Sequence, residues 1–549
     1  RKKNFHNFWA KIYKYIKMVF RIEQKQREDL ISRMSENLSA IGFHCFGDSI
    51  GESREICEQI ERKAFNVADV ASETTVETHH NKNVSGDRPI KESMSLYITK
   101  AAELLKEECL KRSKSTIDKQ TGNSSTTTTT TKAVQDKDTF DVALDSSDRE
   151  FYTGPRAEEV LAPLLLPNAS FKFVRLSTKS WGIDAAKVAK RAFENLKDTL
   201  EVVDLADTIA GRPEVEALKA MEIMCEGLSQ CKLKEVDLSD NAFGEKGVRA
   251  CTKLLQSQTT LEGISFLNNG ISEQAARAIS ELLASPATLK KYHLDKNMTG
   301  DEGTVHVAAV LEKATGIEDF KMAGSRFTSD GAMMLAKALM HGNSLKRLNL
   351  TDNNVNEEGG IAFIEVFKKH TKLVYLNLEA TALGEEVTGK VAHVVAEHCP
   401  DLETLIISAN DILREGVDSV SEAISKMRKL KVLKITDNEL GDIGVAKICI
   451  ALQTSGAKIE ELDVSCNAIS KSGAEAVSKL ATTSLKSTIK KVNLDQNWIQ
   501  EDAVESIKKT FADAGLDSVL MPLDENDPDE EADDEDADEV LDLLSKLKM

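Results

Sequence analysis

The sequence predicts an α/β fold: a horseshoe of about eleven repeats preceded by a small α-helical domain. Three observations predict it. First, a ten-residue segment recurs through the second half of the 549-residue chain. Second, each copy begins at the last residue of a short stretch of alternating apolar residues. Third, each copy is followed by residues with helical apolar spacing. Between positions 241 and 497 the copies are 28 to 30 residues apart, and an earlier copy begins at Leu205. Such a constant period indicates one structural unit used many times.

The repeated unit carries the leucine-rich repeat signature. Residues 233–241, LKEVDLSDN, read L-x-x-L-x-L-x-x-N. A period of 28 or 29 residues leaves room for a strand, a turn and a helix, and residues 247–255 supply the helical half. One unit cannot bury its apolar face alone, so neighbours stack as in ribonuclease-inhibitor-like horseshoes. We therefore expect parallel strands on an inner rim, helices outside, and a concave face that binds a protein.

The fourth position of the repeat is predicted to form a ladder of buried polar side chains. An asparagine can donate to and accept from the backbone of adjacent coils where the strand turns. Thr208, Ser325 and Thr381 occupy three of the positions, and we expect local irregularity there rather than a break. The other eight positions, the predicted structural ladder, are Asn241, Asn269, Asn297, Asn353, Asn410, Asn438, Asn467 and Asn497.

Two adjacent asparagines are predicted to have different roles. Along residues 263–269, GISFLNN, alternate residues of the strand face inward. The repeat pattern buries Asn269 in the ladder and turns Asn268 outward at the end of the strand. Asn268 is therefore a candidate binding residue, and Asp240 occupies the equivalent position one unit earlier.

Charge and cysteine usage exclude several classes of protein. The formal charge is −19, with 71 basic and 90 acidic residues, so binding to nucleic acid is disfavoured. No stretch reaches about 18 uncharged apolar residues, so we expect no transmembrane span. The nine cysteines form no C-x-x-C pair, which argues against a zinc site and a disulfide scaffold. We expect a cytoplasmic protein with no metal and no cofactor.

No enzyme active site stands out in the sequence. Residues 384–391, GEEVTGKV, resemble a phosphate-binding G-x-x-x-x-G-K-[ST] loop. However, Val391 replaces the hydroxyl residue, two glutamates lie where phosphate would sit, and the segment falls at the turn into a repeat helix. No Ser/His/Asp or Cys/His constellation is recognisable. A hydrolase is therefore disfavoured.

The rest of the chain is organised around the array. The basic segment at the N-terminus suits an interfacial amphipathic helix, a helix that packs on its own domain, or a poorly ordered terminus. Residues 524–539 hold 12 acidic residues and no basic one, which favours an extended solubilising tail or a tail that binds a basic partner. A short apolar patch suited to docking follows at 540–544.

The predicted parts are a basic amphipathic segment (1–22), a helical domain (23–112), a Thr-rich linker (113–139), an N-terminal cap (140–200), the repeats (201–515) and an acidic tail (516–549).

Repeat number, tail and N-terminal segment together resemble the Ran GTPase-activating proteins of plants. The resemblance covers nearly the whole chain, and the helical domain at 23–112 resembles the WPP domain of those plant proteins. The segments that carry the likeness are LADTIAGRP (205–213), LSDNAFG (238–244), LNNG (267–270), PLDENDP (522–528), LISRMSENL (30–38) and ICEQIERKAF (56–65).

The resemblance implies a GTPase activator with no active site of its own, acting on Ran-GTP in nucleocytoplasmic transport and in mitotic Ran gradients. The GTPase supplies its phosphate loop, magnesium and a glutamine that orients water. An activator need only hold that glutamine in its productive rotamer. The family's functional asparagine corresponds to Asn268 and its functional arginine to Arg212.

Other interpretations of these residues remain open. Arg212 is either an ordinary surface arginine in a Gly-Arg-Pro turn or a residue that orders the interface with the partner, and Asp240 is a candidate contact to a basic patch on the GTPase. The alternative function is a non-catalytic leucine-rich-repeat scaffold that binds another protein on its concave face.

One part of the family pattern is missing. The Trp-Pro-Pro motif expected before the first helix falls at residues 20–22, which read FRI. The resemblance implies that the WPP domain anchors members of the family at the nuclear envelope through coiled-coil WPP-interacting proteins. We therefore expect a cytoplasmic protein with weak or absent targeting to the nuclear rim. Imaging of residues 1–115 fused to a fluorescent reporter checks this expectation, and a sharp nuclear rim would contradict it.

Overall fold

The structure, a computed structural model, describes residues 138–142, 149–413, 416–527 and 537–547. The chain divides into two units, 1–131 and 132–549, and every described residue belongs to the second. The predicted basic segment, the WPP-like domain and nearly all of the linker therefore lie outside the described residues.

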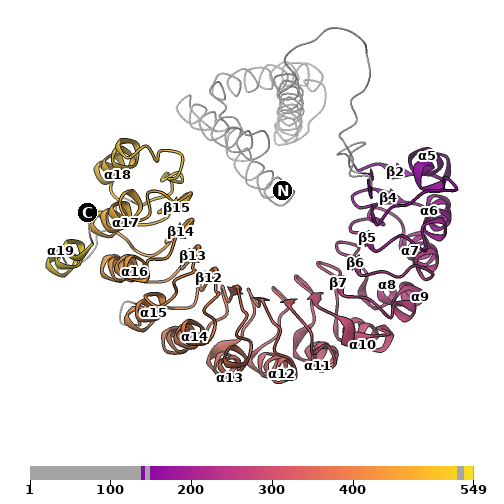
Figure 1. Cartoon of the computed structure of the whole chain (residues 1–549), viewed down its shortest axis with the longest axis horizontal. Helices are drawn as coiled ribbons and strands as arrows, with labels where there is room; N and C mark the ends of the chain where they lie inside the picture. Colours follow the sequence, from indigo (N-terminus) through magenta and orange to yellow (C-terminus); the bar gives the residue numbers. More distant parts are fainter. Residues whose placement is uncertain (1–137, 143–148, 414–415, 528–536, 548–549) are drawn as a thin grey trace, which may run out of the picture. The chain divides into compact units, whose positions relative to one another are not determined.

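A parallel sheet of thirteen strands lines the inner face of the described array (Figure 1). Neighbouring strands pair in register, so that equivalent residues of successive repeats face each other. Val236 pairs with Ile264, and Ile264 pairs with Tyr292. These three central residues are all buried, because alternate strand residues face the helices. In order along the sheet, the strands are β1 (Thr139–Asp141), β3 (Phe173–Arg175), β5 (Val202–Asp204), β6 (Glu235–Asp237), β7 (Gly263–Ser265), β8 (Lys291–His293), β9 (Asp319–Lys321), β10 (Arg347–Asn349), β11 (Tyr375–Asn377), β12 (Thr404–Ile406), β13 (Val432–Lys434), β14 (Glu461–Asp463) and β15 (Lys491–Asn493).

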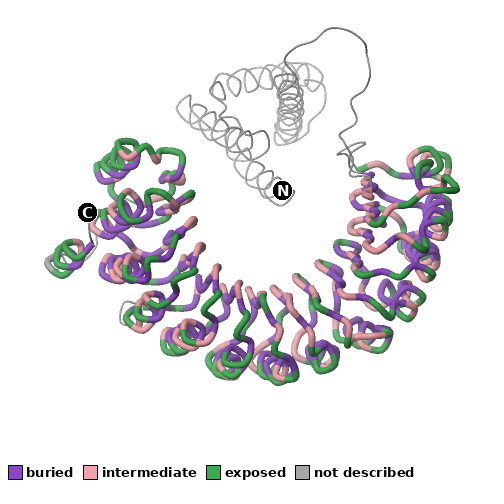
Figure 2. Tube along the Cα trace, in the orientation of Figure 1, coloured by how far each residue is buried: buried purple, intermediate pink, exposed green. Residues whose placement is uncertain are grey.

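Helices cover the outer side of the sheet, one or two after each strand of the array (Figure 1). The core lies between the two layers and is mostly aliphatic, so buried residues follow the inner side of each helix (Figure 2). The helices of the array are α6 (Ile183–Asn195), α7 (Glu214–Leu228), α8 (Gly244–Ala250), α9 (Thr252–Ser257), α10 (Glu273–Leu282), η3 (Pro286–Thr288), α11 (Gly300–Leu311), α12 (Ser329–Leu339), α13 (Asn356–Lys369), α14 (Gly384–His398), α15 (Val417–Ile424), α16 (Gly441–Ser455), α17 (Lys471–Thr482) and α18 (Glu501–Asp513).

The predicted fold class is confirmed for the described part of the chain. The strands from β5 to β15 belong to the eleven repeats recognised in the sequence, and β1 and β3 extend the same sheet beyond the first of them. Each repeat therefore contributes one strand to the inner rim and helical structure to the outer face, as the 28-residue period requires.

A compact cluster forms the N-terminal edge of the described array. The strands β2 (Phe151–Tyr152) and β4 (Ser180–Trp181) form a separate parallel pair beside α5 (Gly154–Val160) and η2 (Ala162–Leu165). The rings of Tyr152 and Trp181 are fully buried and meet edge to face, with centroids 4.8 Å apart. Trp181 Nε1 donates to the carbonyl of Leu176 at 3.1 Å, so the buried indole is satisfied.

The array continues past residue 515. The amide of Met521 donates to the carbonyl of Val492 at 2.8 Å, and Leu523 is buried. The side-chain oxygen of Asn526 accepts from the amide of Asn497 at 2.9 Å. The first residues of the acidic segment therefore complete the last coil, and the beginning of the tail is part of the folded structure.

The apolar patch near the C-terminus forms a helix, α19 (Ala537–Lys546). It packs on the outside of α16 and α17 (Figure 1), where Val540 and Leu543 are buried. Lys479 Nζ donates to the carbonyl of Leu544 at 2.9 Å. The docking suggested by the apolar pattern therefore takes place within the chain.

Candidate functional site

The fourth position of the repeat forms a continuous ladder of side-chain amides. Asn269 Nδ2 donates to the carbonyl of Leu238 in the preceding coil at 2.8 Å, and its side-chain oxygen accepts from the amide of Asn241 at 2.8 Å. Buried backbone groups at the strand turns are satisfied in this way. The eight ladder asparagines are all buried and each donates to a carbonyl one coil earlier: Asn241, Asn269, Asn297, Asn353, Asn410, Asn438, Asn467 and Asn497.

The three substituted ladder positions keep part of this bonding. Thr208 Oγ1 lies 2.8 Å from the carbonyl of Leu205, and Thr381 Oγ1 lies 2.6 Å from that of Leu378. Ser325 Oγ lies 3.2 Å from the carbonyl of Leu294. All three hydroxyl residues are fully buried, and strand pairing passes through their repeats without offset. The ladder is therefore locally altered at these positions but not interrupted.

The residue just before each ladder position forms a second column, here called the ridge. Every ridge residue has a left-handed backbone, with φ between 52° and 59°. Asparagine and aspartate tolerate this conformation better than most residues, which is a structural reason for their presence there. The ridge consists of Asp207, Asp240, Asn268, Lys296, Gly324, Asp352, Ala380, Ala409, Asp437, Cys466 and Gln496.

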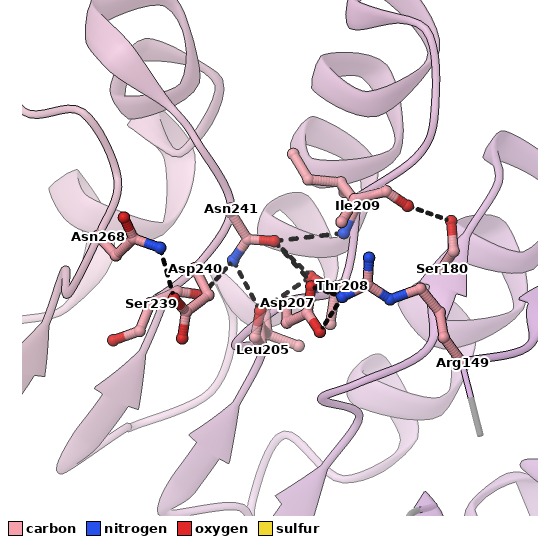
Figure 3. Close-up of polar contacts among 11 residues, drawn as sticks. Arg149, Ser180, Leu205, Asp207, Thr208, Ile209, Ser239, Asp240, Asn241 and Asn268 are labelled. Carbon is pink, nitrogen blue, oxygen red and sulfur yellow. Dashed lines mark hydrogen bonds and ion pairs between the residues drawn. The ribbon is translucent and has the colours of Figure 1, made fainter. Parts of the chain in front are cut away.

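The structure places Asn268 on the ridge with its side chain exposed, whereas Asn269 is fully buried. Asn268 Nδ2 donates to Asp240 Oδ1 at 2.8 Å (Figure 3). Its backbone amide donates to the carbonyl of Asp295 at 2.9 Å, which fixes the turn to the next coil. The site therefore presents an amide and a carboxylate side by side on neighbouring coils.

A salt bridge that the sequence interpretation missed continues the ridge on the N-terminal side. Arg149, from the N-terminal edge, pairs with Asp207 one coil before Asp240 (Figure 3). The two residues are 58 positions apart, so no local pattern could predict their contact. The common ridge position of Asp207, Asp240 and Asn268 was visible in the sequence and indicates that their side chains line up.

Arg212 is held firmly inside the N-terminal edge. Its Nε donates to Ser180 Oγ at 3.0 Å, and Nη2 donates to the carbonyls of Ser180 and Tyr152 at 2.8 and 3.1 Å. Nη1 pairs with Glu216 at 3.0 Å, and the guanidinium lies 5.1 Å from the ring centre of Phe151. Only 15% of the side chain is exposed. The structure therefore uses Arg212 to join the first repeat to the residues before it.

The inner face beyond Asn268 carries mixed charge. His293 Nε2 lies 3.0 Å from Asp319 Oδ1. Burial opposes ionisation of Asp319, but the hydrogen bond from His293 and the charges of Lys321 and Arg347 hold the pKa of its carboxyl below the usual value. Burial raises the pKa of Asp295. Since these groups lie on β8, β9 and β10 and in the turn after β8, a partner at Asn268 would meet charges of both signs.

Alternating charges line the other edge of the strands. The residue just before each strand is a glutamate in one repeat and a lysine in the next from 201 to 490, except at Val374. These exposed pairs form a row across the array: Lys234–Glu201, Lys290–Glu262, Lys346–Glu318, Lys431–Glu403 and Lys490–Glu460, at 2.6 to 3.0 Å. Because each charge has a partner one coil away, this edge is largely neutralised within the chain.

The segment that resembles a phosphate loop is the start of a repeat helix. Helix α14 begins at Gly384, Thr388 Oγ1 donates back to the carbonyl of Gly384 at 2.7 Å, and Lys390 pairs with Glu386. Within the described ranges, no three His, Cys, Asp or Glu residues gather in a way that could hold a metal ion. No helix among the same residues is long and apolar enough to span a membrane.

Comparison with known proteins decides the family. A sequence profile described as "Leucine Rich repeat" matches residues 229–250, 341–363, 426–449 and 457–478. The chain is 46% identical over 505 residues to RAN GTPase-activating protein 2 of Arabidopsis thaliana, which covers 92% of this chain and 89% of the relative. The chain belongs to the Ran GTPase-activating proteins. The resemblance to the plant members of that family is thereby confirmed, while the WPP-like part lies outside the described residues.

Shorter matches to other Ran GTPase-activating proteins agree with this family. RAN GTPase-activating protein 1 of Arabidopsis thaliana is 44% identical over 22% of this chain and 23% of its own length. Ran GTPase-activating protein 2 of Caenorhabditis elegans is 34% identical over 20% of this chain and 11% of its own length. A solved internalin from Listeria monocytogenes covers 65% of this chain and 87% of its own, at 14% identity and a TM-score of 0.37, and adds nothing to the assignment.

Proposed function

We propose that this protein stimulates GTP hydrolysis by Ran by ordering the GTPase's own catalytic glutamine. The observation that carries the proposal is the exposed amide of Asn268 on the ridge, beside a ladder asparagine that already satisfies the fold. An amide donates and accepts at once, so it suits holding another amide in one orientation. Family membership supports Ran as the GTPase.

The proposed mechanism needs no further catalytic group from this chain. A small GTPase supplies the phosphate loop, the metal ion and the glutamine that orients the attacking water. Restricting that glutamine to its productive rotamer lowers the orientational part of the barrier. A single amide on a rigid ridge is sufficient for this task, because strand pairing and the ladder fix its backbone on both sides.

For Arg212 we propose an ordering role rather than insertion into the partner's active site. Its guanidinium donors are already bonded to Ser180, Tyr152 and Glu216. Removing these donors would take a charged hydrogen bond from each of the carbonyls of Ser180 and Tyr152 in a part-buried site, which is costly. Arg212 therefore supports the function by holding the first coil, and with it the start of the ridge, against the N-terminal edge.

In the cell, we propose that this activity on Ran-GTP supports nucleocytoplasmic transport and mitotic Ran gradients from the cytoplasm. WPP-interacting proteins remain proposed partners of residues 23–112, with the altered motif at 20–22 weakening their contact. The alternative is a scaffold that binds a protein on its inner face without stimulating hydrolysis.

A single-turnover assay with GTP-loaded Ran tests the proposal. Asn268→Ala is expected to lower the stimulated rate by more than about tenfold, as for loss of one positioning group. The matched control is Asp437→Ala, which places alanine in the same left-handed backbone on a distant part of the ridge and is expected to keep the full rate. Unchanged hydrolysis with Asn268→Ala would reject the role of Asn268. Wild-type protein that binds Ran-GTP without raising hydrolysis would favour the scaffold.

A further inference from the structure

The contact between Asn268 and Asp240 has a fixed polarity. A carboxylate can only accept hydrogen bonds, so the group of Asn268 that faces Asp240 is its NH2 group and not its oxygen. The oxygen then points away from Asp240 (Figure 3). Among the residues that the structure describes, none donates a hydrogen bond to this oxygen.

Both members of the pair stand on anchored backbone. The amide of Asp240 donates to the carbonyl of Leu267 at 2.7 Å, and that of Asn268 donates to the carbonyl of Asp295 at 2.9 Å. Each residue immediately precedes a buried ladder asparagine, Asn241 or Asn269. The separation of the two side chains is therefore set by the stacking of the coils, and the hydrogen bond fixes what remains free, the rotation of the Asn268 amide.

We propose that Asp240 is a positioning residue that orients the Asn268 amide so that its oxygen faces the partner. The inference rests on the proposed function. It defines the partner group as a hydrogen-bond donor, which for a glutamine is its own NH2 group. The glutamine oxygen is then left to accept from the attacking water, which is the orientation that hydrolysis requires.

This role differs from a direct contact between Asp240 and a basic group on the partner. A contact residue contributes to binding, whereas a positioning residue contributes to the rate once the complex has formed. Alanine is a valid replacement, because Ala380 and Ala409 occupy the ridge elsewhere with φ of 52°. Asp240→Asn removes the charge but keeps a side-chain oxygen that can accept from Asn268.

The first experiment measures single-turnover hydrolysis by GTP-loaded Ran across a range of activator concentrations. Asp240→Ala is expected to lower the saturating rate by about three- to tenfold and to leave the half-saturating concentration within about twofold. Asp240→Asn is expected to restore most of the rate, and Asp437→Ala to match wild type. In the Asn268→Ala background, Asp240→Ala is expected to have no further effect, since the two residues act as one unit.

Two outcomes of this assay would overturn the proposal. A higher half-saturating concentration with an unchanged saturating rate would make Asp240 a binding contact. An equal loss of rate in the presence and absence of Asn268 would make its action independent of that amide. If wild-type protein binds Ran-GTP without stimulating hydrolysis, the proposed function is rejected, and the positioning role with it.

The second experiment examines the pair without the GTPase. Protein labelled with 15N at asparagine is compared with Asn268→Ala to assign the side-chain amide signal of Asn268. In free wild-type protein, one amide proton is expected downfield and protected from exchange with water, and Asp240→Ala is expected to remove both properties. Absence of this signature in wild-type protein would overturn the fixed polarity, whatever the hydrolysis assay shows.

Discussion

The ladder and the ridge run one residue apart along the same turns, yet they use similar side chains in opposite ways. Asn269 is fully buried and satisfies the backbone of its neighbours, whereas Asn268 is exposed and its side-chain amide donates to another ridge side chain, that of Asp240. The left-handed backbone at Asn268 turns its side chain away from the core. The comparison shows that residue type alone does not decide whether an asparagine stabilises the fold or meets a partner.

The sharpest way to break this comparison is to remove one amide from each column. Asn269→Ala would leave the amide of Asn241 without its acceptor in a buried turn, and it would remove one of the two side-chain donors to the carbonyl of Leu238. We expect it to lower the free energy of unfolding by about 2–4 kcal/mol. Asn268→Ala is expected to lower that free energy by no more than about 1 kcal/mol, the cost of placing alanine in a left-handed backbone at an exposed position. Urea denaturation compares the two, and equal losses would contradict the distinction.

A substitution at Arg212 tests whether the stability of the N-terminal edge depends on the ladder or on the hydrogen bonds that Arg212 makes to Ser180 and Tyr152. Arg212→Ala removes donors from the carbonyls of Ser180 and Tyr152, and we expect a loss of about 1–3 kcal/mol. Hydrogen exchange should rise in residues 149–195 and stay unchanged beyond β8. Arg212→Lys should rescue little, because an ammonium cannot reproduce the fork of donors. Uniform exchange along the whole array would contradict a local clamp.

The row of lysine and glutamate residues on the other strand edge should give the smallest effect. Lys346→Ala removes an exposed pair with Glu318 at 2.7 Å, and we expect it to cost no more than about 1 kcal/mol. The cost should shrink further at 1 M salt, since exposed charges are screened. Thermal denaturation at low and high salt measures it. A loss of unfolding free energy as large as that of Asn269→Ala would mean that the edge pairs stabilise the stacked repeats as much as the ladder does.

The sequence was sufficient to predict the fold and the buried column. A constant period with asparagine at one position requires stacked coils, and strict alternation along residues 263–269 separates Asn268 from Asn269. The Asn268–Asp240 contact was also within reach, because two ridge positions 28 residues apart must lie on adjacent coils.

Three contacts that escaped prediction join parts of the chain that are not related by the repeat. Arg212 binds residues 32 and 60 positions earlier, outside any repeat register. The same holds for Arg149 with Asp207 and for the docking of α19 on α16 and α17. Periodicity describes neighbours along the array, whereas the segments that make these contacts follow no period.

The uniform backbone of the ridge has a consequence for how such proteins change. Seven residue types already occupy it with nearly the same φ, from glycine and alanine to lysine and glutamine. Side chains can therefore be exchanged at the ridge without a change of backbone, at positions spaced by the roughly 4.8 Å between neighbouring strands. Because the stacking of the repeats does not require a particular side chain on the ridge, the specificity for a partner can evolve there while the buried ladder stays the same.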